Sequence, residues 1–219
     1  MLISDLKEYN LPQLSITDKA GFALITMEDY DIFHLPVVDD KQYLGLISKE
    51  DLLDADEEAS IGSLSSKLLK VSLRDDQHFF FALKLFNQYE LSLLPVVSEQ
   101  NELESVITRK GMIKGAAEFL NADTPGGIII LEMDSRNFSS GEINRLVETN
   151  DASITQLNSH IEPGTGLLVV TIKINKTEVS DVVATLQRYE YNVRNYFGEE
   201  LFKNELKENY DLLMTYLNI

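Results

Sequence analysis

The first half of the chain alternates short apolar runs with polar turns. Residues 35–39, LPVVD, predict a buried strand that begins near a proline, where the backbone angle φ is fixed. A polar turn at 39–41 leads to a second apolar run at 43–47, which predicts the other strand of a hairpin. Ser48 is a good helix N-cap, and Asp51 follows in the first turn of the helix that we expect there.

Two interpretations of Ser48 and Asp51 stay open from local physics. The start of a helix offers unpaired N–H groups and a positive partial charge, so the two side chains could frame a site for a ribose or phosphate. A serine followed three residues later by an acid is also an ordinary capping box, which stabilises the helix and binds nothing.

The same pattern occurs twice. Residues 94–97 repeat 35–38 after 59 positions, and residues 106–108 repeat 46–48 after 60, so the second hairpin carries one extra residue. The apolar stripe of the preceding helix repeats as well, at positions 20, 23, 24 and 27 and then at 79, 82, 83 and 86. A repeat of this length predicts two supersecondary units that bury their apolar faces against each other.

This order of motifs resembles a CBS domain. It runs from an apolar helix through LPVV and a hairpin to two apolar residues, a Ser or Thr, and an acid three residues later. Two in tandem are similar to the CBS pair, or Bateman module, with repeats at 1–60 and 61–121. The resemblance implies small β-sheets with packed helices, in the α/β (α+β) class. It also implies a regulatory or sensor role, without catalysis, in which the pair binds an adenine nucleotide.

The resemblance assigns a ligand site. Asp51 is expected to accept hydrogen bonds from the ribose hydroxyls beside Ser48, with AMP, ADP, ATP or S-adenosylmethionine as the ligand. The walls of this cleft are expected from the second repeat, at Ser66, Val71, Leu91, Ser92 and Leu93. The resemblance also implies a homodimer, since CBS modules usually pair. The alternative to nucleotide binding is a ligand-free homo-oligomeric scaffold that docks partners.

The second repeat departs from the pattern. Gly111 stands where the acid is expected, and Ser105 replaces Gly45. Thr108 is therefore expected to lack a ribose acceptor, and its cleft to be empty or to hold something else. The basic residues near the two clefts are Lys49, Arg109 and Lys110.

Turn-forming residues at 121–127 predict a domain boundary, and the spacing of apolar residues changes after it. Strands are expected at 128–133, 152–161, 167–174 and 191–197, with helices after Ser139 or Ser140 and at 179–189. This order predicts the ferredoxin-like βαββαβ plan. Behind a CBS pair, residues 126–198 resemble an ACT domain, as in bacterial acetoin-utilisation accessory proteins.

Two segments in this half have open uses. The loop at 134–138 is where related domains hold an amino acid, although its polar residues also suit a simple turn. Residues 199–219 predict an amphipathic helix that docks on a neighbouring domain or subunit, because its apolar stripe would otherwise be exposed.

Composition narrows the function classes. The 19 basic and 36 acidic residues give a formal charge of −17, which disfavours nucleic-acid binding. The absence of cysteine excludes disulfides, and we expect a cytoplasmic protein without signal peptide or membrane helix. The acidic run at 54–58 could hold a divalent cation or be simply solvated. His34, His78 and His160 are isolated from one another and from known catalytic motifs, so we expect no enzyme; His34 suits a pocket wall or a packed residue.

Overall fold

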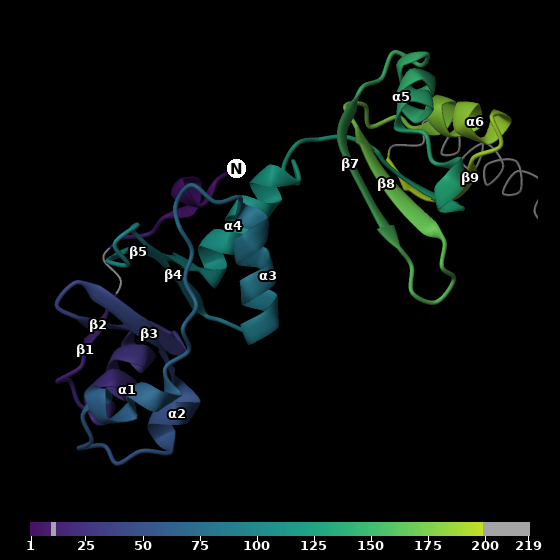
Figure 1. The fold of residues 1–219 in the computed structure, drawn as a ribbon. Helices are drawn as coiled ribbons and strands as arrows, with labels where there is room; N and C mark the ends of the chain where they lie inside the picture. The colour runs from purple at the N-terminus through teal and green to yellow at the C-terminus, as the bar shows by residue number, and fades with distance from the viewer. Residues whose placement is uncertain (10–11, 199–219) are drawn as a thin grey trace, which may run out of the picture. The chain divides into compact units, whose positions relative to one another are not determined.

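The computed structural model describes residues 1–9 and 12–198, which belong to two compact units (Figure 1). The first unit is Met1–Phe119 and the second is Leu120–Ile219. Each is mixed α and β, as the sequence predicts. We describe each unit by itself.

The first unit contains two similar sets of elements. The first set is η1 (Ile3–Leu6), β1 (Leu14–Ser15), α1 (Ala20–Asp29), β2 (His34–Asp39), β3 (Gln42–Ser48) and α2 (Lys49–Leu53). The second set is η2 (Ile61–Lys67), α3 (Phe79–Tyr89), β4 (Leu93–Val97), β5 (Leu103–Thr108) and α4 (Arg109–Phe119). Strand β2 pairs with β1 in parallel and with β3 antiparallel, and β4 pairs antiparallel with β5.

The two hairpins confirm the sequence repeat in detail. The register shifts between Val37 and Val38 in the first hairpin and between Val96 and Val97 in the second. Both hairpins therefore have an irregularity at the same place in the LPVV strand. The edges of the hairpins also meet, because the Tyr43 N–H donates to the Asn101 carbonyl at 2.9 Å.

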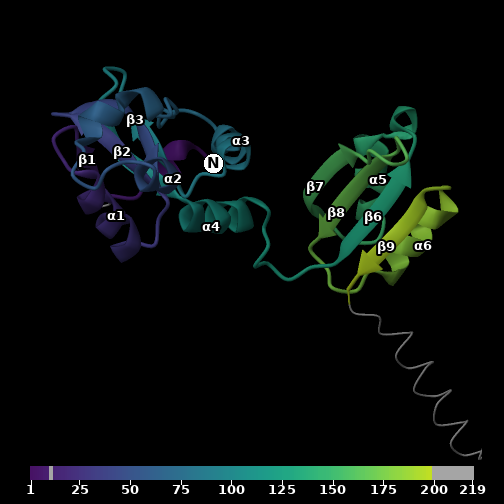
Figure 2. The same ribbon diagram turned by 90° about the horizontal axis from the view of Figure 1, so that it is seen from below.

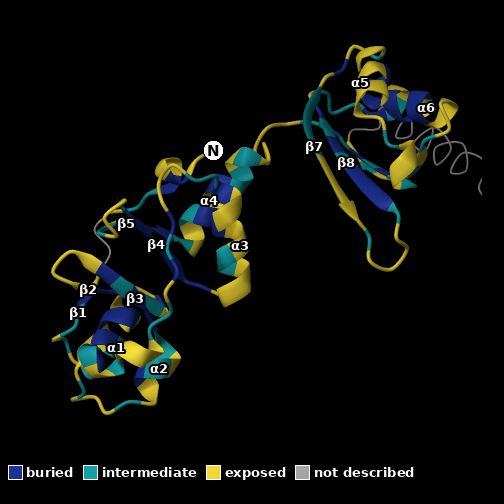
Figure 3. Ribbon diagram, in the orientation of Figure 1, coloured by how far each residue is buried: buried dark blue, intermediate teal, exposed yellow. Residues whose placement is uncertain are grey.

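One hydrophobic core joins the two repeats. Leu35 and Val37 of β2 and Leu94 and Val96 of β4 are fully buried in the same cluster. The buried positions lie along the strands and the inner sides of the helices, as the dark blue segments of Figure 3 show. The repeats thus share their apolar faces, as the repeat length predicts.

Two local features of the first unit are not marked by the apolar pattern. The N-cap position of α1 is Lys19, without a side-chain cap bond. Asp18 accepts a hydrogen bond from the Ser15 N–H at 2.8 Å and closes the preceding turn. Leu83, expected on the buried stripe of α3, is exposed.

The second unit has the predicted ferredoxin-like plan. Its elements are β6 (Ile128–Met133), η3 (Ser135–Asn137), α5 (Ser140–Glu148), β7 (Ile154–Ile161), β8 (Leu168–Ile174), α6 (Ser180–Arg188) and β9 (Asn192–Phe197). The sheet order is β7-β8-β6-β9, with antiparallel neighbours throughout. Figure 2 shows the four strands side by side, with α5 and α6 on one face.

The apolar pattern sets this arrangement. Strand β6 alternates between buried and half-buried residues, so one of its faces meets the helices. Ser139 caps α5 by accepting the Glu142 N–H at 3.3 Å, as predicted, and Ile143 and Leu146 are buried against the sheet. The predicted helix at 199–219 lies outside the described residues. No helix among residues 1–9 and 12–198 has the length and hydropathy to cross a membrane.

Candidate functional site

Ser48 and Asp51 lie together at the start of α2. The Ser48 hydroxyl accepts the Asp51 N–H at 3.1 Å and donates to Asp51 Oδ2 at 2.6 Å. Asp51 is half-buried, so its carboxylate is open to solvent on one side. The capping contact is therefore present, and it holds the carboxylate beside the hydroxyl. Helix α2 has only five residues, so its helix dipole is small.

Lys67 is a neighbour of Asp51 that the sequence prediction missed. Its ammonium group lies 3.7 Å from Asp51 Oδ1 and donates to the Asp51 carbonyl at 3.3 Å. The predicted wall residue Ser66, next to Lys67 in η2, is exposed. The link between the repeats thus brings a cation to the first cleft.

The other predicted walls of this cleft are mostly core residues. Leu91 and Leu93 are completely buried, and Val71 is nearly so. The Val71 carbonyl accepts a hydrogen bond from the Tyr43 hydroxyl at 2.7 Å. These side chains pack inside the unit, so a ligand at the surface could contact only the backbone of these residues. Assignment of the first cleft to a nucleotide stays a prediction.

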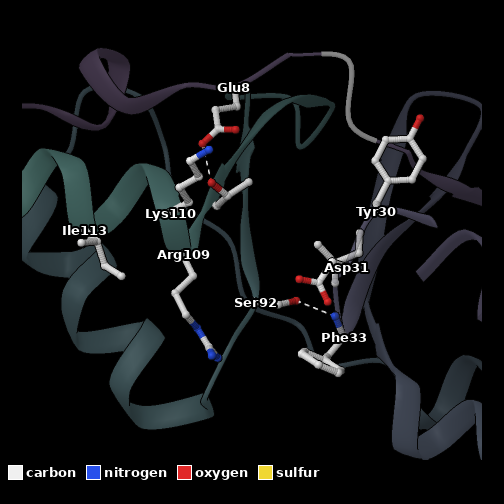
Figure 4. A pocket seen from close by; sticks show the side chains of 10 residues that line it. Glu8, Tyr30, Asp31, Phe33, Ser92, Arg109, Lys110 and Ile113 are labelled. Carbon is white, nitrogen blue, oxygen red and sulfur yellow. Dashed lines mark hydrogen bonds between the residues drawn. The ribbon is translucent and has the colours of Figure 1, made fainter. Parts of the chain in front are cut away.

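A cavity of about 530 Å³ lies between the two repeats (Figure 4). It is lined by the N-terminal segment, the turn after α1, the start of β4 and the first turns of α4. The lining residues are Glu8, Tyr30, Asp31, Ile32, Phe33, Ser92, Thr108, Arg109, Lys110 and Ile113. Of the predicted site residues, only Ser92 is among them.

The cavity contains the second-repeat threonine and, beside it, a carboxylate that the sequence prediction missed. Thr108 does not lack a carboxylate, because its hydroxyl donates to Glu8 Oε1 at 2.5 Å. The same hydroxyl accepts the Gly111 N–H at 3.0 Å. Thr108 therefore makes the same two kinds of hydrogen bond as Ser48. Its acid comes from a segment 100 positions away, and nothing local in the sequence marks Glu8 as its partner.

The charges of the cavity are mixed. Arg109 places its guanidinium against the backbone, donating to the carbonyls of Glu90 at 3.0 Å and Leu91 at 2.9 Å. Lys110 adds a second cation to the lining, and Asp31 adds a second acid beside Glu8. The backbone of Asp31 is left-handed, with φ of 53°, where it turns from α1 towards β2. Two acids and two bases thus face one cavity.

His34 joins the two repeats through Ser92, a residue of the cavity lining. Its Nδ1 accepts the Ser92 N–H at 3.3 Å and lies 3.2 Å from the Ser92 hydroxyl, which in turn accepts the Phe33 N–H at 3.0 Å. Burial lowers the pKa of His34 below 6.5, and nearby Arg109 lowers it further, while Asp51 acts in the opposite direction. A neutral imidazole with an unprotonated Nδ1 fits these contacts. His34 is a packed residue in this arrangement, one of the two roles that the sequence predicts for it.

Position 105 differs from position 45 in space as well as in sequence. Gly45 has a φ of 153°, and a Cβ there would lie 2.8 Å from the Leu68 Cβ. The hydroxyl of Ser105 is buried, and no partner for it occurs among the described residues. Only the first hairpin therefore needs a glycine at this position.

The second unit and the acidic run offer weaker sites. In the loop at 134–138, Arg136 binds the Asp134 carboxylate through Nε at 3.0 Å and through a terminal nitrogen at 2.9 Å. The two charged groups of this loop therefore satisfy each other, which favours turn chemistry. Within the described part of the chain, no group of three or more His, Cys, Asp or Glu is placed to hold a metal ion.

Comparisons with known proteins identify the first unit. The CBS domain model matches residues 3–58 and 66–118. The first unit is therefore a tandem pair of CBS domains, and the chain belongs to the CBS-domain proteins. This confirms the CBS resemblance, whereas the ACT resemblance of the second unit rests on its topology.

Similar proteins are found at low sequence identity. An uncharacterized protein of Methanocaldococcus jannaschii is 29% identical over 85 residues, which are 36% of this chain and 27% of that protein. The alignment thus spans about a quarter of the curated relative's length. A CBS domain pair/ACT domain protein of Thermotoga maritima is 24% identical, with a TM-score of 0.50, over 55% of this chain and 99% of that one. It has the same fold over the CBS pair.

Two further crystal structures are similar. A putative acetoin utilization protein from Vibrio cholerae is 24% identical, with a TM-score of 0.48, over 56% of this chain and 95% of its own. The protein CBSX2, crystallised in complex with AMP, is 22% identical, with a TM-score of 0.47, over 54% of this chain and 97% of its own.

Proposed function

We propose that this protein is a non-catalytic regulatory sensor whose CBS pair binds an adenine nucleotide in the cavity between the repeats. The observation that carries the proposal is the composition of that cavity, which combines apolar walls with a hydroxyl, carboxylates and cations. Its volume of about 530 Å³ falls in the range of roughly 300–1,000 Å³ that is typical of small-molecule sites.

Each part of a nucleotide has a suitable counterpart in the lining. Ile32, Phe33 and Ile113 offer apolar surface to a flat base. Glu8 and Thr108 offer oxygen atoms to the ribose hydroxyls. Arg109 and Lys110 offer positive charge to a phosphate. These groups come from both repeats, so a ligand that spans them would tie the repeats together.

The charge balance favours a ligand with few phosphates. The formal charges of Glu8 and Asp31 cancel those of Arg109 and Lys110. A triphosphate would bring several negative charges to a site with no net positive charge, within a chain of formal charge −17. We therefore expect AMP to bind more tightly than ATP. S-adenosylmethionine, which has no phosphate, is the next candidate.

A thermal-shift panel of AMP, ADP, ATP, S-adenosylmethionine and free amino acids tests this function. Saturating ligand stabilises the folded state by mass action, by about 2.7 kcal/mol at 100 times its Kd. We expect AMP to raise the unfolding temperature most among the phosphates. If no adenosyl compound changes the unfolding temperature, the sensor function is wrong and the ligand-free scaffold takes its place.

We also propose that the protein is a homodimer through the helices of the CBS pair. Phe22 and Ile25 on α1 and Phe81 on α3 are more than half exposed. Phe22 and Phe81 are repeat equivalents, so the exposed apolar surface follows the internal symmetry. A second copy would cover it through an isologous interface. Light scattering should give about twice 24.8 kDa, and Phe22→Asp should shift the mass towards the monomer.

The βαββαβ unit supports an ACT-like role for residues 126–198 as the part that reports the state of the CBS pair. An amino-acid sensor is the alternative for this unit. The amino acids in the thermal-shift panel distinguish the two, since an amino-acid sensor would be stabilised by one of them without any nucleotide.

A further inference from the structure

We infer that Glu8 is the ribose-binding carboxylate of the cavity and replaces the acid that the second repeat lacks at Gly111. The inference rests on the proposed adenine-nucleotide function and specifies which residues of this chain perform it. It moves the principal site from the Asp51 cleft to the Thr108 cavity, and it assigns a binding role to the N-terminal segment.

The two hairpins of the pair have their acid at different positions. Leu46 of β3 forms a bridge with Leu69, and its repeat equivalent, Val106 of β5, forms the same antiparallel bridge with Glu8. Glu8 and Leu69 are therefore structural equivalents. Beside β3, the flanking segment carries Leu69 and the following helix carries Asp51; beside β5, the flanking segment carries Glu8 and the following helix has Gly111.

The carboxylate of Glu8 occupies the space that a side chain at position 111 would fill. A Cβ built on Gly111 would overlap Glu8 Oε1 and would lie 3.4 Å from Thr108 Oγ1. The glycine is thus what leaves room for the acid from the neighbouring segment. An aspartate at 111 and a glutamate at 8 cannot both adopt these positions.

The backbone holds Glu8 in place. The Glu8 N–H donates to the Val106 carbonyl at 2.8 Å, and the Val106 N–H donates to the Glu8 carbonyl at 3.1 Å. Both hydrogen bonds fix the segment next to β5. The carboxylate therefore reaches Thr108 from an anchored backbone, as Asp51 reaches Ser48 from its helix.

The chemistry of the pair suits a cis-diol. A carboxylate can accept hydrogen bonds from two hydroxyls at once, and each bond is strengthened by its charge. Among the described residues, Thr108 is the hydrogen-bond partner of this carboxylate, through Oε1 alone. Glu8 lines the cavity together with Phe33 and Arg109, so a ribose bound at Glu8 lies within the same site as the base and phosphate surfaces.

Calorimetric titration with AMP and with 2′,3′-dideoxy-AMP tests the inference. Wild type should bind AMP more tightly than the dideoxy analogue. Glu8→Gln keeps the size of the side chain and removes its charge, so AMP affinity should fall about 10- to 100-fold. In that variant, AMP and the dideoxy analogue should bind about equally, which a purely structural role of Glu8 would not produce.

A compensating variant distinguishes loss of the binding carboxylate from misfolding. Glu8→Ala combined with Gly111→Asp returns the acid to the helix, as in the first repeat. It should recover most of the affinity and the preference for the diol that Glu8→Ala alone loses. Asp51→Asn is the matched control; it removes one carboxylate from the other cleft and should retain the diol preference.

The outcomes separate this inference from the proposed function. If Glu8→Gln binds AMP like wild type while Asp51→Asn does not, the nucleotide function stands and the assignment to Glu8 is overturned. Failure of the compensating variant to restore a diol preference, with its fold intact by circular dichroism, would also overturn it. If wild type binds neither nucleotide, the proposed function and this inference both fail.

Discussion

His34 Nδ1 accepts a hydrogen bond from the Ser92 N–H at 3.3 Å, and this contact joins the two repeats between their clefts. The Ser92 hydroxyl lies 3.2 Å from the same nitrogen and accepts the Phe33 N–H at 3.0 Å. Because Ser92 lines the cavity, the protonation state of His34 affects the position of a cavity-lining residue. A protonated Nδ1 could no longer accept the Ser92 N–H, although it could donate to the Ser92 hydroxyl oxygen, so protonation would break one of the two contacts.

This contact predicts a pH dependence. The pKa of His34 is lowered in the folded state, chiefly by burial, so the unfolded chain binds a proton more readily. The stability that this gives is complete above about pH 6.5, the ordinary value, and is lost as the pH falls through the folded-state pKa. Urea unfolding from pH 8 to pH 5 should show a smaller loss of stability in His34→Asn than in wild type. Parallel curves for the two proteins would contradict the prediction.

A second prediction concerns the buried Tyr43. Its hydroxyl donates to the Val71 carbonyl at 2.7 Å, and burial raises the pKa of the phenol far above its usual value of about 10. Tyr43→Phe leaves a buried carbonyl without a donor, so we expect a loss of about 1–3 kcal/mol in the free energy of unfolding. Tyr89→Phe, at an exposed position on α3, is the control and should change stability by less than about 0.5 kcal/mol.

A third prediction concerns Gly45. Its φ of 153° and its close approach to Leu68 leave no room for a side chain, so Gly45→Ala should destabilise the first unit by about 1–3 kcal/mol. Gly21→Ala, in α1 of the same unit, meets only ordinary contacts at 3.4 Å and should stabilise by about 0.5–1 kcal/mol. Thermal unfolding of the two variants should move in opposite directions, and equal effects would contradict the backbone argument.

A fourth prediction compares the two hydroxyls. Thr108→Ala should weaken AMP binding, because the hydroxyl that positions the Glu8 carboxylate is lost. Ser48→Ala removes the equivalent hydroxyl from α2 and should cost about 1 kcal/mol of stability as a lost N-cap, with AMP affinity unchanged. Equilibrium dialysis with labelled AMP measures both variants. A larger loss of affinity in Ser48→Ala would return the site to the Asp51 cleft.

The sequence predicts those features that depend on neighbours along the chain. The hairpin at LPVV follows from apolar runs and turn residues, and the Ser48 cap follows from its place before a helix. Repetition of both motifs then predicts two units that share a core. The four strands and two helices of the second unit were predictable for the same reason, since each has its own period of apolar residues.

The site depends on contacts between distant segments, and there the sequence prediction is weakest. Glu8 reaches Thr108 because a β-bridge places the N-terminal segment beside β5, and Lys67 reaches Asp51 because η2 passes beside α2. Neither pairing is marked by a periodic pattern of residues along the chain. The repeat offset of 59 or 60 aligns Glu8 with Lys67 or Leu68, so only the bridges of the folded chain show that Glu8 and Leu69 are equivalent.

A crystal structure of the protein with AMP tests the central claim most directly. The account predicts electron density for AMP in the cavity between the repeats, with the ribose hydroxyls at Glu8 and the phosphate towards Arg109 or Lys110. Density for AMP in the Asp51 cleft alone, with this cavity free of nucleotide, would contradict it.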